Sequence, residues 1–292
     1  MLSHRSVRVL FATGLGTPSY GIWYNRTMKP KQPRKPTLSP SKISTYLACR
    51  VMYRYTYIDK IGRFYYRPKA YHSFGASLHR TLEDFHKAGG AEAQSPEQII
   101  ETLHTVWTSL GYASLQEEEQ RIGMAAEMLE HYHEDYLVEG VKTILTEKQL
   151  KWDMGEFILL GRLDRLDEHP DGALEVVDYK SGRLSVTEEE VRDDLAMGIY
   201  ALLAHLNNPD RPMSASIYCL RSGEKGTAAF TNEDFVEIED GVRAIAEEIL
   251  QIDEDSVIEP AWLPNVCPEC DYLRLCARRM RWDIEKMIGG ST

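Results

Sequence analysis

The chain is 292 residues long, with 43% hydrophobic and 27% charged side chains. These values match ordinary globular proteins and exclude a chain that is fibrous or disordered throughout. No apolar run approaches the roughly 18 residues that a membrane-spanning helix needs, so the sequence predicts a soluble protein with no membrane partner.

The net charge of −11 conceals a strong asymmetry along the chain. Residues 1–58 contain ten Lys or Arg and no Asp or Glu, whereas the other 234 residues contain 24 basic and 45 acidic side chains. A basic arm on an acidic body is consistent with a nucleic-acid partner held at local patches. An unstructured basic tail on an ordinary acidic enzyme fits the charge equally well.

Residues 1–37 are expected to form a basic, disordered tail outside the fold. Proline recurs at Pro30, Pro33 and Pro36, which forbids a helix and favours an extended chain. The apolar piece Val7–Ala12 is short for a signal peptide, and no small-residue cleavage site follows it. The cytoplasm is therefore the expected compartment. An organelle transit peptide, which would place the protein in an organelle matrix, and a natural start at Met28 stay open as alternatives.

A single domain is expected over residues 38–292, and it begins with helices. Ser39 is a good N-cap with Pro40 at the first helical position, and helical spacing continues to Arg54. Further helices are predicted at about 74–87, 96–110 and 116–137. The last two belong to a helical insertion at about 90–140.

The pattern then changes to short strands rich in β-branched residues, predicted at 145–152, 156–166, 173–179, 214–220 and 227–230. Two more helices are predicted at about 187–206 and 232–251. Helices before and after a small central sheet indicate the α/β class with a mostly helical surround.

The loop Pro170–Gly172 is a good three-residue hairpin turn and places Asp164 opposite Asp178. Two carboxylates that face each other across a ladder lie roughly 5 Å apart at Cβ and repel unless a cation lies between them. Lys180 lies on the same strand face as Asp178. The apolar residues before Asp178 indicate a strand buried on both faces, which favours Mg²⁺ or Mn²⁺ as the partner of the acids. A surface ion pair between Asp178 and Lys180 is the alternative.

The segments GRLDRLD (161–167) and VVDYKSG (176–182) resemble the paired motifs of the RecB-like P-D-(D/E)-x-K nucleases. The resemblance implies a restriction-endonuclease-like core, a small mixed sheet flanked by helices. It also implies a phosphodiester hydrolase in which Lys180 orients and helps to deprotonate the attacking water. The catalytic residues would be Asp164, Asp178 and Lys180. The ligands of Mg²⁺ or Mn²⁺ would be His79, Asp164, Asp178 and the backbone carbonyl of Tyr179.

The segment GASLH (75–79) matches the upstream helix of this family, whose histidine binds the metal. Glu83 lies one turn further on the face of His79 and is expected to support the site. The family often continues with Gln-Leu-x-x-Tyr after the lysine motif. Here Tyr200 fits as a supporting residue, but Ala196 replaces the glutamine, which would lower activity or alter substrate handling.

Five cysteines, an odd number that includes a C-x2-C pair, argue against a secreted disulfide framework and favour metal binding in a reducing compartment. Cys267, Cys270 and Cys276 lie close together in the sequence, and Cys49 is the natural fourth ligand. Cys219 lies in an apolar run and is expected to be a buried neutral thiol. The residues alone leave Zn²⁺ and an iron–sulfur cluster open.

One cysteine before the nuclease motifs and three after them, in a segment at about 260–285, is similar to the iron–sulfur nucleases of the AddB and CRISPR-adaptation types. This resemblance implies a 4Fe-4S cluster on Cys49, Cys267, Cys270 and Cys276. It further implies an exonuclease on single-stranded or frayed DNA, in repair and recombination or in CRISPR adaptation. The chain lacks a helicase-type phosphate loop, so a helicase or a CRISPR-adaptation protein is an expected partner. The basic run from Arg274 to Arg281 either contacts phosphates or complements a helix C-terminus.

Two hypotheses compete with an active nuclease. In the first, the chain is a catalytically weak or inactive nuclease-like module that binds DNA or acts as a scaffold. In the second, the chain is a zinc-stapled adaptor whose acid and lysine residues form a surface ion pair.

Overall fold

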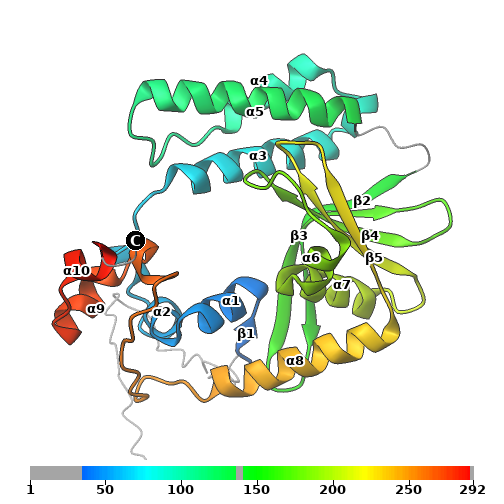
Figure 1. Cartoon of the computed structure of the whole chain (residues 1–292). Coiled ribbons are helices and arrows are strands. Elements are labelled where there is room, and N and C mark those ends of the chain that lie inside the picture. Colours follow the sequence, from blue (N-terminus) through cyan, green and yellow to red (C-terminus); the bar gives the residue numbers. More distant parts are fainter. Residues whose placement is uncertain (1–34, 136–140, 290–292) are drawn as a thin grey trace, which may run out of the picture. The chain divides into compact units, whose positions relative to one another are not determined.

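The computed structural model describes residues 35–135 and 141–289 (Figure 1). The predicted tail up to residue 34 lies outside these ranges. Thr37–Leu38 form strand β1, and the Lys35 ammonium lies 2.6 Å from Asp153 Oδ1. The described fold therefore begins slightly before the expected boundary.

The first half of the fold is helical, as expected. Ser39 caps α1 (Pro40–Ala48) by accepting a hydrogen bond from Lys42 N at 3.3 Å. The expected helix does not run unbroken to Arg54, because Cys49 is extended and separates α1 from α2 (Arg50–Tyr53). Its thiol sulfur then caps α2 by accepting from Met52 N at 3.4 Å. The following elements are the π-helix η1 (Arg54–Ile58), η2 (Gly62–Phe64), α3 (Ala70–Lys87), η3 (Gly90–Glu92), α4 (Pro96–Val106) and α5 (Leu115–Asp135).

Within the described ranges, the strands form one six-stranded mixed sheet in the order β1-β3-β4-β5-β6, with β2 also paired to β3. The pairs β1–β3 and β4–β5 are parallel, and the other pairs are antiparallel. The bounds after β1 are β2 (Lys142–Asp153), β3 (Ile158–Glu168), β4 (Leu174–Lys180), β5 (Met213–Cys219) and β6 (Lys225–Phe230). The α/β class with a restriction-endonuclease-like sheet is confirmed.

The hairpin between β3 and β4 has the predicted register. Gly172 takes a left-handed φ of +87°, and Asp171 accepts from Ala173 N at 2.9 Å, which closes the turn. The ladder then pairs Glu168 with Leu174 and continues to Arg165 and Val177. The turn chemistry therefore fixes which residues lie opposite each other at the far end of the strands.

The helix expected at 187–206 is two helices, α6 (Glu188–Asp193) and α7 (Leu195–Asn207). Asp194 separates them, because its carboxylate caps α7 by accepting from Ala196 N and Met197 N at 2.9 and 3.0 Å. Aspartate competes with the helix backbone in this way and favours a cap over a helix interior. The remaining elements are α8 (Asn232–Leu250), η4 (Cys267–Glu269), α9 (Leu273–Met280) and α10 (Ile284–Gly289).

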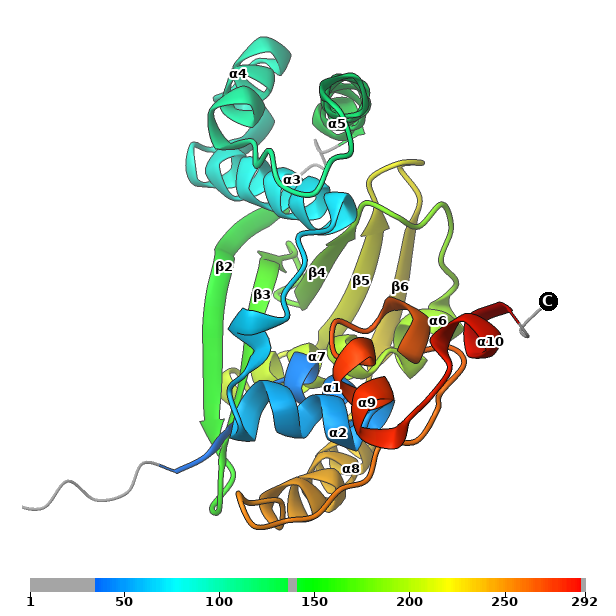
Figure 2. The same ribbon diagram turned by 90° about the vertical axis from the view of Figure 1, so that its left-hand side faces the viewer.

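Helices cover both faces of the sheet (Figures 1 and 2). The larger core packs β3, β4 and β5 against α1, α7 and α8, and includes the fully buried Leu166, Val176 and Ile217. The second core packs α3, α4 and α5 against the opposite face, where Val177 and Tyr179 of β4 point. Strand β4 is therefore buried on both faces, as its apolar run predicts.

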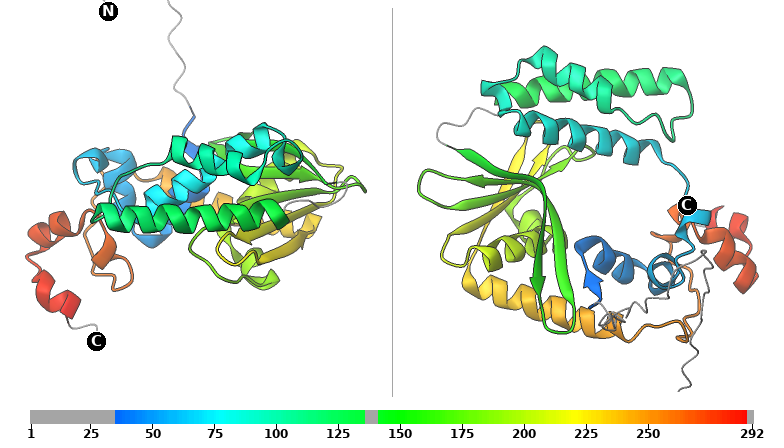
Figure 3. Two further views of the ribbon diagram at one scale, coloured as in Figure 1. Left: turned by 90° about the horizontal axis from the view of Figure 1, so that it is seen from above. Right: turned by 180° about the vertical axis from the view of Figure 1, so that it is seen from behind.

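A third, small cluster joins α2 and η1 to the C-terminal segment that contains α9 (Figure 3). Its buried members are Val51, Tyr55 and Tyr272, and the Tyr272 hydroxyl lies 2.9 Å from Thr56 Oγ1. Two chain segments more than 200 residues apart are packed together here.

No helix in the described part of the chain has the length and apolarity to cross a membrane.

Gly161 of β3 allows α7 to approach the sheet closely. A Cβ atom at this position would lie 2.8 Å from Leu203 Cδ1 and 2.9 Å from Tyr200 Cδ1. We expect Gly161→Ala to lower the free energy of unfolding by about 1–3 kcal/mol through overpacking, measured by urea denaturation. The matched control is Gly123→Ala in α5, where a Cβ meets no atom within 4 Å. That change should stabilise the helix by about 0.5–1 kcal/mol, and equal effects of the two changes would contradict the overpacking account.

Candidate active site

The two predicted acids lie where the ladder between β3 and β4 ends. The last paired residues are Arg165 and Val177, so Asp164 and Asp178 are the next residue beyond the ladder on each strand. The backbone N–H of Tyr179 donates to Asp164 Oδ2 at 2.9 Å. A side-chain hydrogen bond thus continues the connection between the strands and brings Asp164 beside the backbone of β4.

His79 reaches these residues from α3. Its Nδ1 lies 3.1 Å from Asp164 Oδ1, and its Nε2 lies 3.1 Å from the backbone carbonyl oxygen of Tyr179. Burial lowers the pKa of His79, but hydrogen bonds with Asp164 and Glu147 outweigh this effect and raise the pKa to about 10. Without a cation, His79 therefore places a positive charge beside the acids, and only its neutral form would offer a nitrogen to a metal.

Asp178 is only 6% exposed, and Lys180 Nζ lies 2.7 Å from its Oδ2. Burial and the neighbouring Asp164 raise the pKa of Asp178 to about 6, although Lys180 opposes the shift. Burial lowers the pKa of Lys180, but the adjacent Asp178 carboxylate outweighs this effect and the pKa is raised overall. Lys180 is therefore an ammonium in this arrangement, able to donate hydrogen bonds and to stabilise negative charge.

Glu147 of β2 also belongs to this cluster, although no sequence motif pointed to it. Its Oε1 lies 3.8 Å from His79 Nδ1, and its Oε2 lies 2.5 Å from Arg162 Nε. The backbone of Glu147 has a left-handed φ of +47°, a strained conformation of the kind that occurs at functional sites. The β2–β3 register, which pairs Lys148 with Leu163, places Glu147 opposite Asp164. A register derived from the turn after Asp153 would have identified it.

The donor set suits a divalent cation. Ligand atoms of His79, Glu147 and Asp164 all lie within 4.8 Å of one another. The Oδ2 atom of Asp178 is buried and makes no hydrogen bond of good geometry, although it is ion-paired with Lys180. Carboxylates with one imidazole are ligands that Mn²⁺ accepts, and Mg²⁺ prefers the oxygens. The residues present therefore fit Mg²⁺ or Mn²⁺.

The two predicted supporting residues have different positions. The Tyr200 ring packs over Gly161. Burial, followed by the charges of Asp178 and Asp164, raises the pKa of its hydroxyl. The Glu83 carboxylate is buried but engaged on its own helix, where it pairs with Lys87 and lies 3.6 Å from Arg80 Nη1. Tyr200 therefore lies near enough to the acids to feel their charge, whereas Glu83 is engaged by the cations of its own helix.

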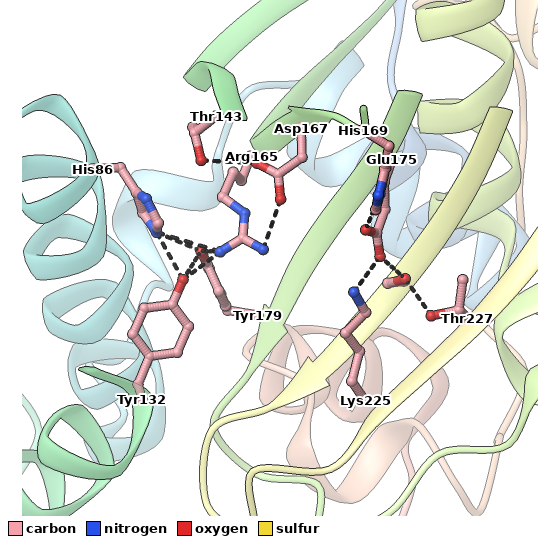
Figure 4. A network of polar contacts seen from close by, with 11 residues as sticks. His86, Tyr132, Thr143, Arg165, Asp167, His169, Glu175, Tyr179, Lys225 and Thr227 are labelled. Carbon is pink, nitrogen blue, oxygen red and sulfur yellow. Dashed lines mark hydrogen bonds and ion pairs between the residues drawn. The ribbon is translucent and has the colours of Figure 1, made fainter. Parts of the chain in front are cut away.

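The side chain of Tyr179 lies on the opposite face of the sheet, in a buried polar network (Figure 4). Arg165 Nη1 donates to the Tyr179 hydroxyl at 2.9 Å, and Arg165 Nη2 lies 2.9 Å from Asp167 Oδ2. The Tyr179 hydroxyl also lies 2.7 Å from that of Tyr132 and 3.0 Å from His86 Nε2. Burial, and then Arg165, lower the pKa of His86 to about 2, so its imidazole is neutral. This network holds the residue whose backbone contacts both Asp164 and His79.

Four of the five cysteines line one small cavity between α2 and the C-terminal segment, namely Cys49, Cys267, Cys270 and Cys276. Burial, followed by the neighbouring thiols, raises the pKa of Cys276 to about 11. No three cysteine sulfurs in the described ranges lie within 4.8 Å of one another, whereas a single tetrahedral Zn²⁺ would hold its thiolates ~3.8 Å apart. Cys219 lies fully buried in β5 and does not line this cavity.

A mixed sheet with two acids and a lysine at the end of its central hairpin defines a nuclease class, and comparison with known families agrees. The chain belongs to the PD-(D/E)XK nuclease superfamily, whose family model matches residues 37–277. Among solved structures it is similar to the crystal structure of a proposed exonuclease from Eubacterium rectale, with 13% identity and a TM-score of 0.37. That match covers 70% of this chain and 91% of the other. No curated protein is detectably similar in sequence.

The network beneath Tyr179 predicts a large effect on stability. Arg165 and Asp167 are 7% and 1% exposed, so Arg165→Met leaves a buried carboxylate without its cation. We expect the free energy of unfolding to fall by about 3–5 kcal/mol in urea denaturation. The control is Arg50→Met, which removes an ion pair with Glu248 whose side chains are 61% and 56% exposed, and it should cost about 0–1 kcal/mol. Equal losses for both variants would contradict the role given to burial.

Proposed function

We propose that this nuclease is a deoxyribonuclease that depends on Mg²⁺ or Mn²⁺ and degrades single-stranded or frayed DNA from its ends. The observation that carries the proposal is the convergence of Asp164, Asp178, Lys180 and His79 around the backbone of Tyr179. Two acids and a lysine at one end of a buried hairpin are suited to hydrolysis of a phosphodiester bond. The same geometry gives little support to a surface ion pair, because Asp178 is buried.

The residues divide the chemistry between them. His79, Asp164 and Glu147, whose ligand atoms lie within 4.8 Å of one another, would hold the cation, and Asp178 and the carbonyl of Tyr179 would complete its ligands. When bound, such a cation acts as a Lewis acid on the phosphate and lowers the pKa of water. Lys180 donates hydrogen bonds that orient the attacking water and stabilise the charge that develops on the phosphate. Despite burial, the adjacent Asp178 carboxylate raises the pKa of Lys180 when no cation is bound, which suits it to orient the attacking water as a hydrogen-bond donor. With the cation in place, Lys180 would also help to deprotonate that water.

The four cysteines support a second metal centre, which we propose to be a 4Fe-4S cluster. They line one cavity, they come from α2 and the C-terminal segment, and all are free thiols. The backbone N–H of Met52 donates to the sulfur of Cys49, and that of Leu263 donates to the sulfur of Cys267. Hydrogen bonds of this kind stabilise thiolates bound to iron. The cluster would join chain segments more than 200 residues apart, so its main role is structural, and free thiols favour a reducing compartment such as the cytoplasm.

DNA repair and recombination, or CRISPR adaptation, are the pathways in which such a chain would act. Because the sequence has no helicase-type phosphate loop, unwinding of duplex DNA would fall to a helicase or CRISPR-adaptation partner.

Residues 38–292 are proposed as one nuclease domain, in which α4 and α5 form the inserted helical layer on α3.

The catalytic assignment predicts loss of cleavage without loss of the fold. Asp178→Ala, Lys180→Ala and Asp164→Asn should each lower the rate on end-labelled single strands by about 10²–10⁴-fold, because each removes a group needed in the transition state. Wild-type cleavage should require Mg²⁺ or Mn²⁺ and stop in chelator. The control is Lys151→Ala, which removes an exposed lysine of β2 and should leave the rate unchanged.

Rapid cleavage by Asp178→Ala or Lys180→Ala, measured at saturating Mn²⁺, contradicts this assignment of the site. A wild-type protein that binds single strands but never cuts them would instead favour the DNA-binding scaffold, for which Ala196 is the sequence argument.

The cysteine assignment predicts a brown protein when purification excludes oxygen, with iron and sulfide in near-equal amounts. Replacing Cys49, Cys267, Cys270 or Cys276 with Ser should bleach the colour and lower the melting temperature, because metal binding is coupled to folding and closes a long loop. Cys219→Ser is the matched control and should keep the colour. Colourless wild-type protein with one zinc would discard the cluster and leave the nuclease site untouched.

A further inference from the structure

A pocket of about 310 Å³ lies between the segment around η2 and α9, outside the candidate active site. Two sequence segments about 200 residues apart form it, and its lining includes Phe64, Tyr66, Arg67, Arg274 and Arg278. We call these five residues the aromatic–arginine platform. None of them takes part in the contacts of the candidate active site or of the cysteines.

The aromatic rings of the platform are exposed to solvent. Phe64 is 69% exposed and Tyr66 is 60% exposed, whereas the intervening Tyr65 packs its ring 5.7 Å from that of Tyr272 in the third core. Alternate residues thus point inwards and outwards. The inward ring anchors the segment. The Arg63 guanidinium lies over one face of the Phe64 ring, 4.6 Å from its centroid, so the other face of Phe64 and the exposed ring of Tyr66 are available for a ligand.

The charge of the platform opposes that of the whole chain. Residues 60–82 contain no Asp or Glu, and neither do residues 272–282, although the chain has a net charge of −11. Arg67, Arg274 and Arg278 form no ion pair with any residue of the described ranges. The platform is therefore a local positive patch with cations free for an anionic partner, and Asp271 is the one acid among the described residues that line it.

We propose that the aromatic–arginine platform binds single-stranded nucleic acid, with arginines on the phosphates and the rings of Phe64 and Tyr66 stacked on unpaired bases. Exposed rings beside unpaired cations are the combination that proteins use for single strands. Duplex offers phosphates but no free base faces, and an acidic peptide would leave the rings without a partner. The proposal rests on the proposed function and adds to it a place where the substrate is held.

The position of the platform along the chain fits this role. Helix α3 begins at Ala70, directly after the platform segment, and carries His79 nine residues later, about 14 Å along the helix. A strand held at the platform is therefore within a few nucleotides of the candidate active site. Removing the platform should weaken binding and raise KM, and it should leave kcat at saturating substrate unchanged.

The test measures fluorescence anisotropy of a labelled 20-nucleotide dT strand on the full chain in chelator, across a salt series. Phe64→Ala with Tyr66→Ala should weaken binding by about 5- to 150-fold per stacked base and leave the salt slope unchanged. Arg67→Gln, Arg274→Gln and Arg278→Gln together should lower the salt slope by about 0.7 for each lost phosphate contact. A labelled U20 strand and a blunt duplex are run in parallel. The duplex should bind at least tenfold more weakly than dT20.

Matched controls lie away from the platform. Trp152→Ala removes a partly exposed ring of β2, and Arg192→Gln removes a cation that is ion-paired with Glu188 and Asp234. Both should bind dT20 like the wild type, and all variants should melt within a few degrees of it.

The outcomes separate the platform from the nuclease proposal. If the wild type cuts DNA and the platform variants bind and cut as well as it does, the platform proposal is overturned and the nuclease proposal stands. Weakened binding by the platform variants, with a wild type that never cuts in Mn²⁺, would support the platform and overturn the nuclease proposal. A wild type that binds neither dT20 nor U20 at low salt, or that prefers duplex, would overturn the platform, as would aromatic variants without effect.

Discussion

The arrangement of this protein depends on keeping two carboxylates, Asp164 and Asp178, together at the end of a largely buried hairpin. Like charges in that position repel, and burial adds to the cost of ionising them. The structure meets the constraint with cations from two directions. Lys180 lies on the same strand as Asp178, and His79 comes from α3, on the other side of the strand ends. A site that concentrates negative charge in this way is suited to bind a divalent cation.

Tyr179 connects that site to the interior. Its backbone N–H and carbonyl contact Asp164 and His79, while its hydroxyl lies in the buried network with Arg165 and Tyr132 on the other face of the sheet. Helix α3 also contributes residues to both the site and the buried network. His79 contacts the residues of the site, and His86, two turns later, joins the network around the Tyr179 hydroxyl. The geometry of the site is therefore coupled to the packing of α3 and α5 on the sheet.

Charge is distributed so that a strongly acidic chain can still attract phosphates. The acids are spread over the helices, strands and loops of the rest of the chain, whereas the segment before α3 and the segment of α9 contain no Asp or Glu and meet in space. The cysteine-lined cavity lies beside the same junction, since it is formed by α2 and the C-terminal segment. A metal centre there would fix the relative positions of the two basic segments.

The sequence by itself determined the features that local chemistry controls. The Pro-Asp-Gly turn set the hairpin register and placed Asp164 opposite Asp178, and the apolar run before Asp178 indicated a strand buried on both faces. Ser39 fixed the start of the first helix. In each case the residues that decide the structure lie within a few positions of one another, so their steric and hydrogen-bonding preferences act directly.

Only the tertiary structure decided which distant residues complete the site. Glu147 joins through the register of β2 on β3, Glu83 stays with Lys87 on its own helix, and Asp194 and Cys49 interrupt helices that periodicity alone would continue. These outcomes depend on competition between partners that the fold brings together. A carboxylate binds the nearest cation in space, and a cap forms where packing requires the chain to turn. Neither outcome is encoded in the spacing of residues along one segment.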